Sequence, residues 1–290
     1  MTTKLITVQT LTPQEKVKRF FATVGINILP FLYALTCIVP LVWIFYSSLK
    51  SVTEFEANQI SLPKAPSLYA YVTLFTETNI FTNIINSLRS SVISVFLVLL
   101  IGFINGYFLA RVKFRGRTFL RSYYLFGLLV PIHALLVPTY ILFSYFGLAN
   151  SWYTLIFPYI CCTMATTVYL VESYISAIPR ELEESAGIDG ASFSRTLFSI
   201  ILPISRPILI SAGIIAFFYC WNEFAYALVL ISNDKLHTVP LALMAFKGRH
   251  RIDYPRMMAA MLFAMVPALL LYSAFSKQII KGMVTGAIKG

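Results

Sequence analysis

The chain has 290 residues, of which 58% are hydrophobic and 12% are charged, and its formal net charge is +11. A soluble domain carries about 25% charged residues, so this composition excludes an ordinary water-facing surface and favours a protein that lies in lipid. The basic residues stand in short clusters between apolar runs, which is typical of membrane-protein loops, and we therefore expect no nucleic-acid partner.

Uncharged runs predict an all-α polytopic membrane protein with six transmembrane helices, because a bilayer core about 30 Å thick needs about 20 apolar helical residues. The predicted spans cover residues 27–48, 90–110, two spans within 122–171, 207–231 and 257–276. The stretch Gly147–Trp152 divides the long run into a tight hairpin of spans three and four. The runs are apolar on every face, which excludes the alternating strands of a β-barrel.

The distribution of Lys and Arg predicts the orientation. With the N-terminus in the cytoplasm, 15 of the 23 Lys and Arg residues lie inside, which places both termini in the cytoplasm of a multi-pass plasma (inner) membrane protein. The segment before the first span is polar and the first apolar run is too long for a signal peptide, so no cleaved signal is expected. The predicted organisation is a cytoplasmic segment at 1–26, the first span and outer loop at 27–83, a transmembrane core at 84–281, and a cytoplasmic tail at 282–290.

The segment that follows the first span, residues 50–83, is longer and more polar than the other loops. Its turn-rich sequence fits a solvated connection or a docking surface for an external partner. Both interpretations stay open at this point.

Small residues and prolines inside the spans predict how the helices pack. Gly102, Gly106 and Ala110 recur every four residues in span two, which predicts one smooth stripe packed against another span of this chain. Three prolines are predicted to bend spans three and four, because each removes a backbone hydrogen bond. They are Pro131, Pro138 and Pro158.

Two acidic residues fall in or near the spans. Glu172 is predicted at the cytoplasmic end of span four, within reach of the interface. Glu223 is predicted deeper, beside Asn222, and a charge at mid-bilayer costs about 2.5–3.5 kcal/mol unless it faces a cavity or a partner. Asn222 and Glu223 therefore line or gate a pathway, or they make a structural hydrogen bond between helices.

The cysteines and histidines show no metal-ligand spacing, so no metal site is expected. The cysteines are predicted to act as small buried apolar residues. They are Cys37, Cys161, Cys162 and Cys220.

The segment between spans four and five, residues 178–207, predicts two short helices with a bend. Pro179 suits a first helical position, and the glutamates that follow suit the first turns of a helix. Gly187 and Gly190 permit the bend, and Ser192 caps the second helix. A short acidic helix of this kind either docks into a cleft of a cytoplasmic partner or is a solvated loop.

This segment resembles the EAA loop of the permease subunits of ABC importers, which reads Glu-Ala-Ala, Asp-Gly-Ala and Leu-Pro. The matching residues are Glu184, Ser185, Ala186, Asp189, Gly190, Ala191, Leu202 and Pro203. Ser185 departs from the first alanine of the pattern but is small, so docking is expected to survive. The resemblance implies that the loop forms coupling helices that sit in a cleft of the ATPase subunit, with Glu184 orienting the docked helix.

Two further stretches are similar to maltose-type sugar permeases, and the resemblance runs from about Pro30 to the last residue. They are Trp221–Phe224 and the last part of the chain, with Met258–Ala260 and Thr285–Gly290. The resemblance implies a sugar substrate, a second and different permease, two ATPase subunits and an extracytoplasmic binding protein.

The chain has no Gly-x-x-x-x-Gly-Lys-Ser/Thr phosphate loop. It is therefore expected to be no enzyme and to carry no cofactor, with ATP and Mg²⁺ on the ATPase subunits.

The resemblance also bears on the basic loop before the last span. In related permeases this loop contacts the binding protein, which implies that the basic residues here face an acidic rim on that partner. The predicted contact residues are Lys247, Arg249, His250 and Arg251.

Two other functional classes are disfavoured by the sequence, and a third stays open. A secondary transporter predicts inverted repeats and paired intramembrane charges, and the sequence shows no obvious repeat and one deep acid. An intramembrane enzyme needs a nucleophile with a base, or a metal motif such as His-Glu-x-x-His, and neither is present in the spans. An ABC permease for an amino acid or a peptide stays open as an alternative.

Overall fold

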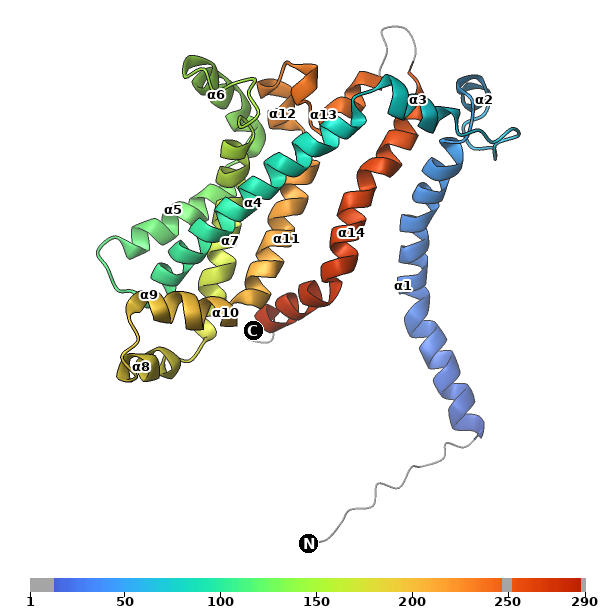
Figure 1. The fold of residues 1–290 in the computed structure, drawn as a ribbon. Coiled ribbons are helices and arrows are strands. Elements are labelled where there is room, and N and C mark those ends of the chain that lie inside the picture. The colour runs from blue at the N-terminus through green and yellow to red at the C-terminus, as the bar shows by residue number, and fades with distance from the viewer. Residues whose placement is uncertain (1–12, 247–251, 288–290) are drawn as a thin grey trace.

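The structure is a computed structural model that describes residues 13–246 and 252–287. All secondary-structure elements in these two ranges are helices (Figure 1). The longer helices are α1 (Pro13–Ser47), α4 (Ile80–Arg111), α5 (Arg117–Leu129), α6 (Ile132–Tyr145), α7 (Ile156–Ala177), α11 (Arg206–Asn222) and α14 (Tyr254–Ala287). The shorter ones are α2 (Val52–Ala57), α3 (Tyr69–Glu77), α8 (Glu181–Ile188), α9 (Phe193–Arg195), α10 (Leu202–Ile204), α12 (Ala225–Leu230) and α13 (Val239–Ala242). A π-helical turn, η1 (Thr196–Ile201), and two 3₁₀ turns, η2 (Asp234–Leu236) and η3 (Leu243–Phe246), complete the chain.

The helices that are long and apolar enough to cross a membrane number four within the described ranges. They are Gly25–Ser47 of α1, α4, α7 and Tyr254–Ser276 of α14. Two bent pairs qualify jointly: α5 with α6, bent by 103°, and Phe193–Ile204 with α11, bent by 71°. The described residues therefore hold four to six candidate spans, and the predicted count of six is the upper end of this range.

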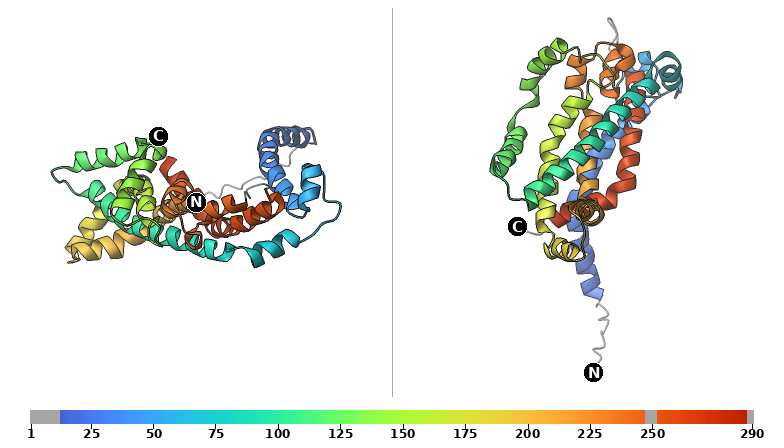
Figure 2. Two further views of the ribbon diagram at one scale, coloured as in Figure 1. Left: turned by 90° about the horizontal axis from the view of Figure 1, so that it is seen from above. Right: turned by 60° about the vertical axis from the view of Figure 1, so that its left-hand side comes forward.

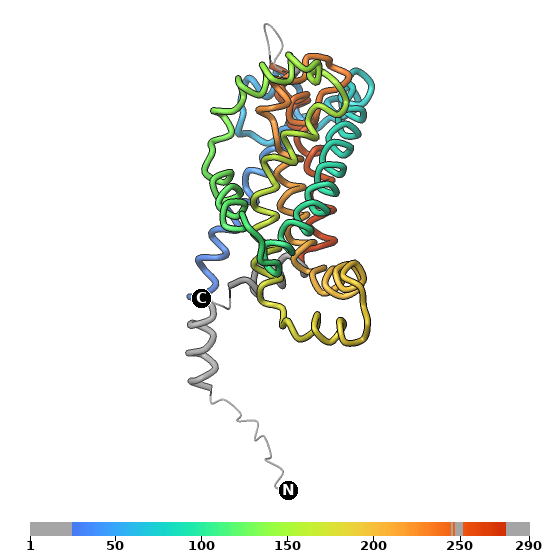
Figure 3. The backbone as a smooth tube through the Cα atoms, turned by 90° about the vertical axis from the view of Figure 1, so that its left-hand side faces the viewer, coloured from blue at the N-terminus to red at the C-terminus, as the bar shows by residue number. Residues whose placement is uncertain are grey.

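The long helices run between two ends of the molecule. The short helices α2, α3, α12 and α13 gather at one end, here called the α13 end, and α8, α9 and α10 lie at the other, the α8 end (Figures 1 and 3). Seen from above, the helices form an elongated curved row, with α5 and α6 at one extreme and α1 at the other (Figure 2). The α8–α10 segment thus stands apart from the elements that connect the spans at the α13 end.

The close pair α4 and α7 forms the centre of the packing, and its contact is made by the small-residue stripe. A Cβ at Gly102 would lie 2.7 Å from Cγ2 of Thr167, and a Cβ at Gly106 would lie 2.6 Å from Cγ1 of Val171. These separations are shorter than carbon atoms tolerate, so only glycine lets the two backbones come this near. The prediction that the stripe packs against another span of the same chain is confirmed.

Helix α4 begins ten residues earlier than the predicted start of span two. The charge of Arg89 sets the predicted start of span two at residue 90, but the guanidinium of Arg89 lies 5.3 Å from the ring centre of Trp152, in a cation–π contact. The preceding turns carry buried Asn83 and Asn86, whose side chains bond the loop near α13. Polar residues there serve the packing of the α13 end, so they do not end the helix.

The prolines act differently from one another. Pro131 stands at the 103° break between α5 and α6, as predicted. Pro138 lies inside α6, and Pro158 is the third residue of α7. A proline in the first turn costs no intrahelical hydrogen bond, so the predicted bend at Pro158 is wrong and α7 continues without a break.

Helix α1 is nearly detached from the other spans. The most apolar stretch of Gly25–Ser47 buries none of its residues against the rest of the described chain. Its last turns are fixed by side chains that donate to the following loop: Trp43 Nε1 to the Gln59 carbonyl at 3.0 Å and the Tyr46 hydroxyl to the Ile60 carbonyl at 2.7 Å. An apolar helix held only at one end needs another covering, from lipid or from a second subunit.

Candidate functional site

The α8–α10 segment contains every residue of the predicted coupling motif, and its turn is closed by Gly190. Gly190 has φ +75°, the left-handed conformation that favours glycine. Its N–H donates to the Gly187 carbonyl at 3.1 Å, and the Ala191 N–H donates to the Ala186 carbonyl at 2.9 Å. This pair of bonds is a Schellman closure, so the residue type at 190 sets the direction in which the chain leaves α8.

The second half of the motif begins at a capped helix start. The Ser192 hydroxyl accepts a bond from the Arg195 N–H at 3.3 Å, as the predicted cap does. Leu202 and Pro203 follow in α10, where Leu202 is half-buried and Pro203 is exposed. Pro179 is not the first helical residue, because α8 begins two residues later at Glu181.

One face of α8 and its turn is open to solvent. Glu184, Ser185 and Asp189 are exposed, whereas Ala186 is buried and Ala191 is half-buried. The adjoining exposed apolar side chains are Leu182, Ile188, Phe193 and Phe198, and Ile188 is 87% exposed. Exposed apolar side chains gathered on one surface are typical of a protein-interaction site, so this face is a candidate docking surface.

The opposite face packs on α4 and α7. Buried Leu197 and Ile201 join Phe103, Tyr107, Val171 and Ile175 in one hydrophobic cluster. The Phe193 ring lies 5.8 Å from the Tyr107 ring. The segment is therefore seated on the ends of two spans while its other face stays free.

Sequence reasoning missed Glu183 and Arg111. The sequence presents three glutamates in the first turns of α8 and does not distinguish them, but the structure turns Glu183 inward to an ion pair with Arg111. A second ion pair joins Arg121 of α5 to Glu172 of α7, with Arg121 Nε 2.8 Å from Oε1 of Glu172. The charged residues of α4 and α7, Arg111 and Glu172, thus find partners on α8 and α5, as charges in membranes do.

The predicted pathway residues lie at a helix break. The fifth span was predicted to run unbroken to residue 231, but α11 ends at Asn222 and Glu223 is extended, with φ −67° and ψ 129°. The Glu223 carboxylate accepts bonds from the N–H groups of Tyr226 at 2.7 Å and Ala227 at 3.2 Å. Because a carboxylate replaces the missing helical acceptors at the start of α12, the prediction that Glu223 lies inside a continuous helix is wrong.

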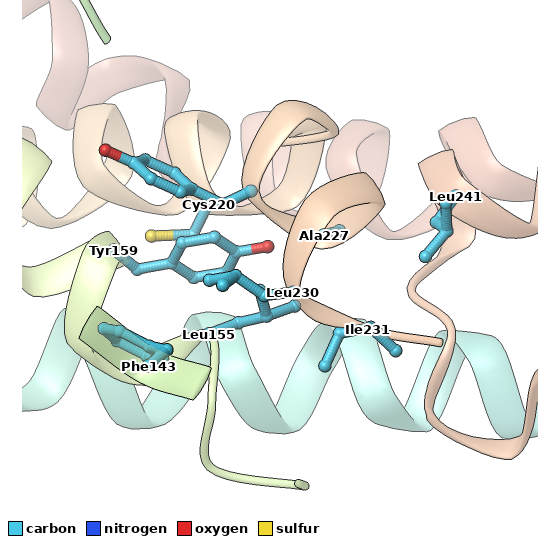
Figure 4. Close-up of a cluster of buried hydrophobic side chains, with 9 residues drawn as sticks. Phe143, Leu155, Tyr159, Cys220, Ala227, Leu230, Ile231 and Leu241 are labelled. Atoms are coloured by element: carbon cyan, nitrogen blue, oxygen red, sulfur yellow. The ribbon is translucent and has the colours of Figure 1, made fainter. Parts of the chain in front are cut away.

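Asn222 and Glu223 also differ in exposure. Glu223 is 6% exposed, next to a cluster in which Tyr159, Cys220 and Leu230 meet beside the α11–α12 break (Figure 4). Asn222 is exposed, and its Nδ2 donates to the Phe218 carbonyl of its own helix at 2.8 Å. The geometry of Glu223 is that of a structural hydrogen-bond acceptor, and Asn222 is the one of the two whose side chain is exposed.

Replacing Glu223 by leucine should lower the free energy of unfolding by about 1–3 kcal/mol, because two buried N–H groups lose their acceptors. Glu223→Gln keeps one acceptor oxygen and should lie between the leucine variant and the native chain. The measurement is the thermal unfolding midpoint of the purified chain in detergent. Asn222→Ala is the matched control, and equal shifts for Asn222→Ala and Glu223→Leu would contradict the capping role.

The predicted contact residues for a binding protein, Lys247, Arg249, His250 and Arg251, lie outside the described residues. The flanking surface at the α13 end is described. There Nη1 of Arg256 lies 3.0 Å from Oε2 of Glu77, and this ion pair joins the start of α14 to the outer segment. Nε of Arg256 lies 3.2 Å from Oδ2 of Asp253. The start of α14 and the outer segment 50–83 therefore meet at the α13 end.

The cysteines differ in burial. Cys220 is buried and Cys162 is half-buried, but Cys37 and Cys161 are exposed within this chain. The prediction of buried cysteines is wrong for those two, because α1 and part of α7 present apolar faces that the chain itself does not cover.

Known proteins resemble this chain over most of its length. The family described as "Binding-protein-dependent transport system inner membrane component" is matched over residues 99–284. The "Putative ABC transporter permease protein ORF2" of Caldicellulosiruptor sp. (strain Rt8B.4) is 36% identical over 253 residues, which cover 87% of this chain and 92% of the relative. The trehalose/maltose transport system permease protein MalG of Thermococcus litoralis is 30% identical over 282 residues, which cover 96% and 99%.

A solved structure shares the fold. A chain of a bacterial ABC transporter involved in the import of the acidic polysaccharide alginate aligns with a TM-score of 0.78 at 19% identity, covering 92% of this chain and 98% of that one. At this identity the likeness concerns the arrangement of the helices.

Proposed function

Because this chain belongs to the family of binding-protein-dependent transport system inner membrane components, we propose that it is the permease subunit of an ABC importer that moves a sugar or an oligosaccharide into the cell. The observation that carries the proposal is the α8–α10 segment. One face of this segment packs on α4 and α7, and the other face is exposed and available to a partner. The sugar class is supported by the trehalose/maltose permease, which matches along nearly the whole chain.

The proposed topology has six spans, with the α8 end and both termini in the cytoplasm. Support comes from the basic residues between α4 and the middle of α5, which gather at the α8 end: Arg111, Lys113, Arg115, Arg117 and Arg121. Lys and Arg collect in cytoplasmic loops. Residues 1–26 and 282–290 are then cytoplasmic, 27–83 form the first span and outer loop, and 84–281 form the transmembrane core.

The partner at the α8 end is an ATPase subunit, and two copies serve a pair of permeases. The exposed Glu184 and Asp189 supply charge to this contact, and the 87% exposed Ile188 supplies an apolar anchor. ATP and Mg²⁺ are held by the ATPase subunits, so this chain carries no cofactor and catalyses no reaction. Its task is to convert closure of the ATPases into alternating access, through rigid-body movement of the docked segment.

The second partner is a homologous, different permease. The exposed apolar side of α1 and a groove of about 450 Å³ between α4, α11 and α14 both need covering. Apart from Arg206, the groove is lined by apolar residues, among them Phe96, Leu209, Phe217, Leu271 and Phe275. Helices of a second permease and membrane lipid are suited to these surfaces.

The third partner is an extracytoplasmic solute-binding protein at the α13 end. The surface that joins the outer segment to the loop around Lys247, Arg249, His250 and Arg251 is the docking region in this proposal. In this proposal the exposed Asn222 lines the path of the delivered sugar, and the hydrogen bonds of Glu223 hold the backbone next to Asn222.

Purification of the affinity-tagged chain from native membranes in mild detergent tests the proposal. We expect one other permease and an ATPase to be recovered, with two ATPase copies per chain by quantitative mass spectrometry. An associated binding protein would then be screened against a panel of sugars. Recovery of the chain alone, including from membranes treated with ATP, Mg²⁺ and vanadate to trap the nucleotide-bound state, would contradict the importer.

A further inference from the structure

The carboxylate of Glu183 joins three elements at the α8 end. Its Oε1 lies 2.6 Å from Nε of Arg111, and its Oε2 accepts a bond from the Tyr107 hydroxyl at 2.8 Å. Arg111 also donates to the Ile178 carbonyl, at the end of α7, at 2.7 Å. The Arg111 and Glu183 side chains are only 7% and 17% exposed. The ion pair and the two hydrogen bonds, one to the carboxylate and one from the guanidinium, therefore connect α8, α4 and the end of α7 at one joint.

Glu183 and Glu184 are neighbours with opposite surroundings. Successive residues on a helix point about 100° apart, and here the first faces α4 while the second is exposed. Glu184 is free to meet a partner, whereas Glu183 holds the segment to the membrane domain.

Helix α4 extends the joint to the other end of the molecule. It is one helix of 32 residues, which is about 48 Å at 1.5 Å per residue. At its far end Asn83 donates to the His237 carbonyl at 3.0 Å and Asn86 to the Lys235 carbonyl at 2.8 Å, while the Ser87 hydroxyl accepts from the Val239 N–H at 2.8 Å. One rigid element is therefore bonded at both ends to segments outside the spans.

We propose that Glu183, held by Arg111 and Tyr107, is the positioning residue that passes movement of the α8–α10 segment into α4 and along it to residues 235–239. The proposal rests on the proposed function, because an ATPase supplies the movement. When α8 is displaced, the carboxylate cannot leave Arg111 without leaving a buried charge unpaired, so α4 follows α8.

The test uses the complex purified with its own ATPase and placed in lipid nanodiscs. Ser232, exposed in the loop after α12, is replaced by cysteine as a reporter, and its labelling by a membrane-impermeant maleimide is timed with and without ATP, Mg²⁺ and vanadate. The chain without the reporter corrects for the native cysteines. We expect vanadate trapping to change the labelling rate by about fivefold or more, the usual lower range of coupling between sites.

In Glu183→Gln the ATPase should stay bound, and the nucleotide-dependent change at Ser232→Cys should fall to about twofold or less. Tyr107→Phe keeps the ion pair and should give an intermediate loss. Glu181→Gln, an exposed carboxylate on the same helix, is the matched control and should respond as the native chain does.

Three results would overturn the proposal: no nucleotide-dependent change in the native complex, native-like responses in both Glu183→Gln and Tyr107→Phe, or loss of ATPase binding in step with loss of the response. Failure of the importer itself is distinguished, because then no ATPase is purified with the native chain.

Discussion

A Gly190→Val variant should insert into the membrane and fold, yet recover about one tenth or less of the ATPase that the native chain recovers. Gly190 has φ +75°, a region that costs an L-residue about 1–2 kcal/mol and a β-branched residue more. A penalty of about 1.4 kcal/mol corresponds to a tenfold change in an equilibrium constant. If the turn instead relaxes to negative φ, the chain leaves α8 in another direction and the exposed face is lost.

The measurement is the ratio of ATPase to tagged chain after purification, together with the monodisperse fraction in size-exclusion chromatography. Gly187→Ala is the matched control, because Gly187 lies three residues earlier, has no positive φ, and has no atom within 4 Å of the site of a Cβ. Native-like ATPase recovery in Gly190→Val would mean that the Schellman turn does not determine docking.

A Gly106→Leu variant should fail at an earlier stage, in the packing of the spans. A Cβ there would lie 2.6 Å from Cγ1 of Val171 and 3.1 Å from the backbone nitrogen of Glu172. The second atom belongs to the backbone of α7, so α4 and α7 must separate. Overpacking usually costs about 1–3 kcal/mol, and here the added bulk also displaces the helices that carry the hydrophobic cluster under α8–α10.

We expect a lower thermal unfolding midpoint and a smaller monodisperse fraction for Gly106→Leu in the same detergent. Gly127→Ala is the comparison, since its Cβ would meet the Ala165 Cβ at an ordinary 3.8 Å. If Gly106→Leu unfolds at the temperature of the native chain, the close approach of α4 and α7 contributes little to stability.

The spans and the close helix contact were predictable because both follow from local or periodic chemistry. A helix in lipid must satisfy its own backbone groups, so an uncharged run of sufficient length predicts a span. A repeat of small residues every four positions likewise predicts one face of close approach, and Gly102 and Gly106 fulfil it. Neither inference requires knowledge of which helix is the neighbour.

The errors arose where a specific side-chain contact overrides the preference that the surrounding residue pattern gives. Apolar residues on both sides of Glu223 predict a continuous helix, but the buried carboxylate bonds two N–H groups ahead of it and starts α12. The charge of Arg89 predicts the end of a span, but its guanidinium makes a cation–π contact with Trp152, which is 63 residues away in the sequence. Periodicity records neither contact.

The sequence by itself determined that this protein is helical and lies in a membrane, and it predicted a bend between two short helices at Gly190. Those conclusions depend on run length, composition and the conformational freedom of glycine, which are properties of neighbouring residues. Only the tertiary structure decided that Glu183 faces α4 while Glu184 faces outward, and that α4 bonds segments at both ends of the molecule. Adjacent glutamates have the same intrinsic chemistry, and the packing of α8 against Tyr107 and Arg111 is what makes them different.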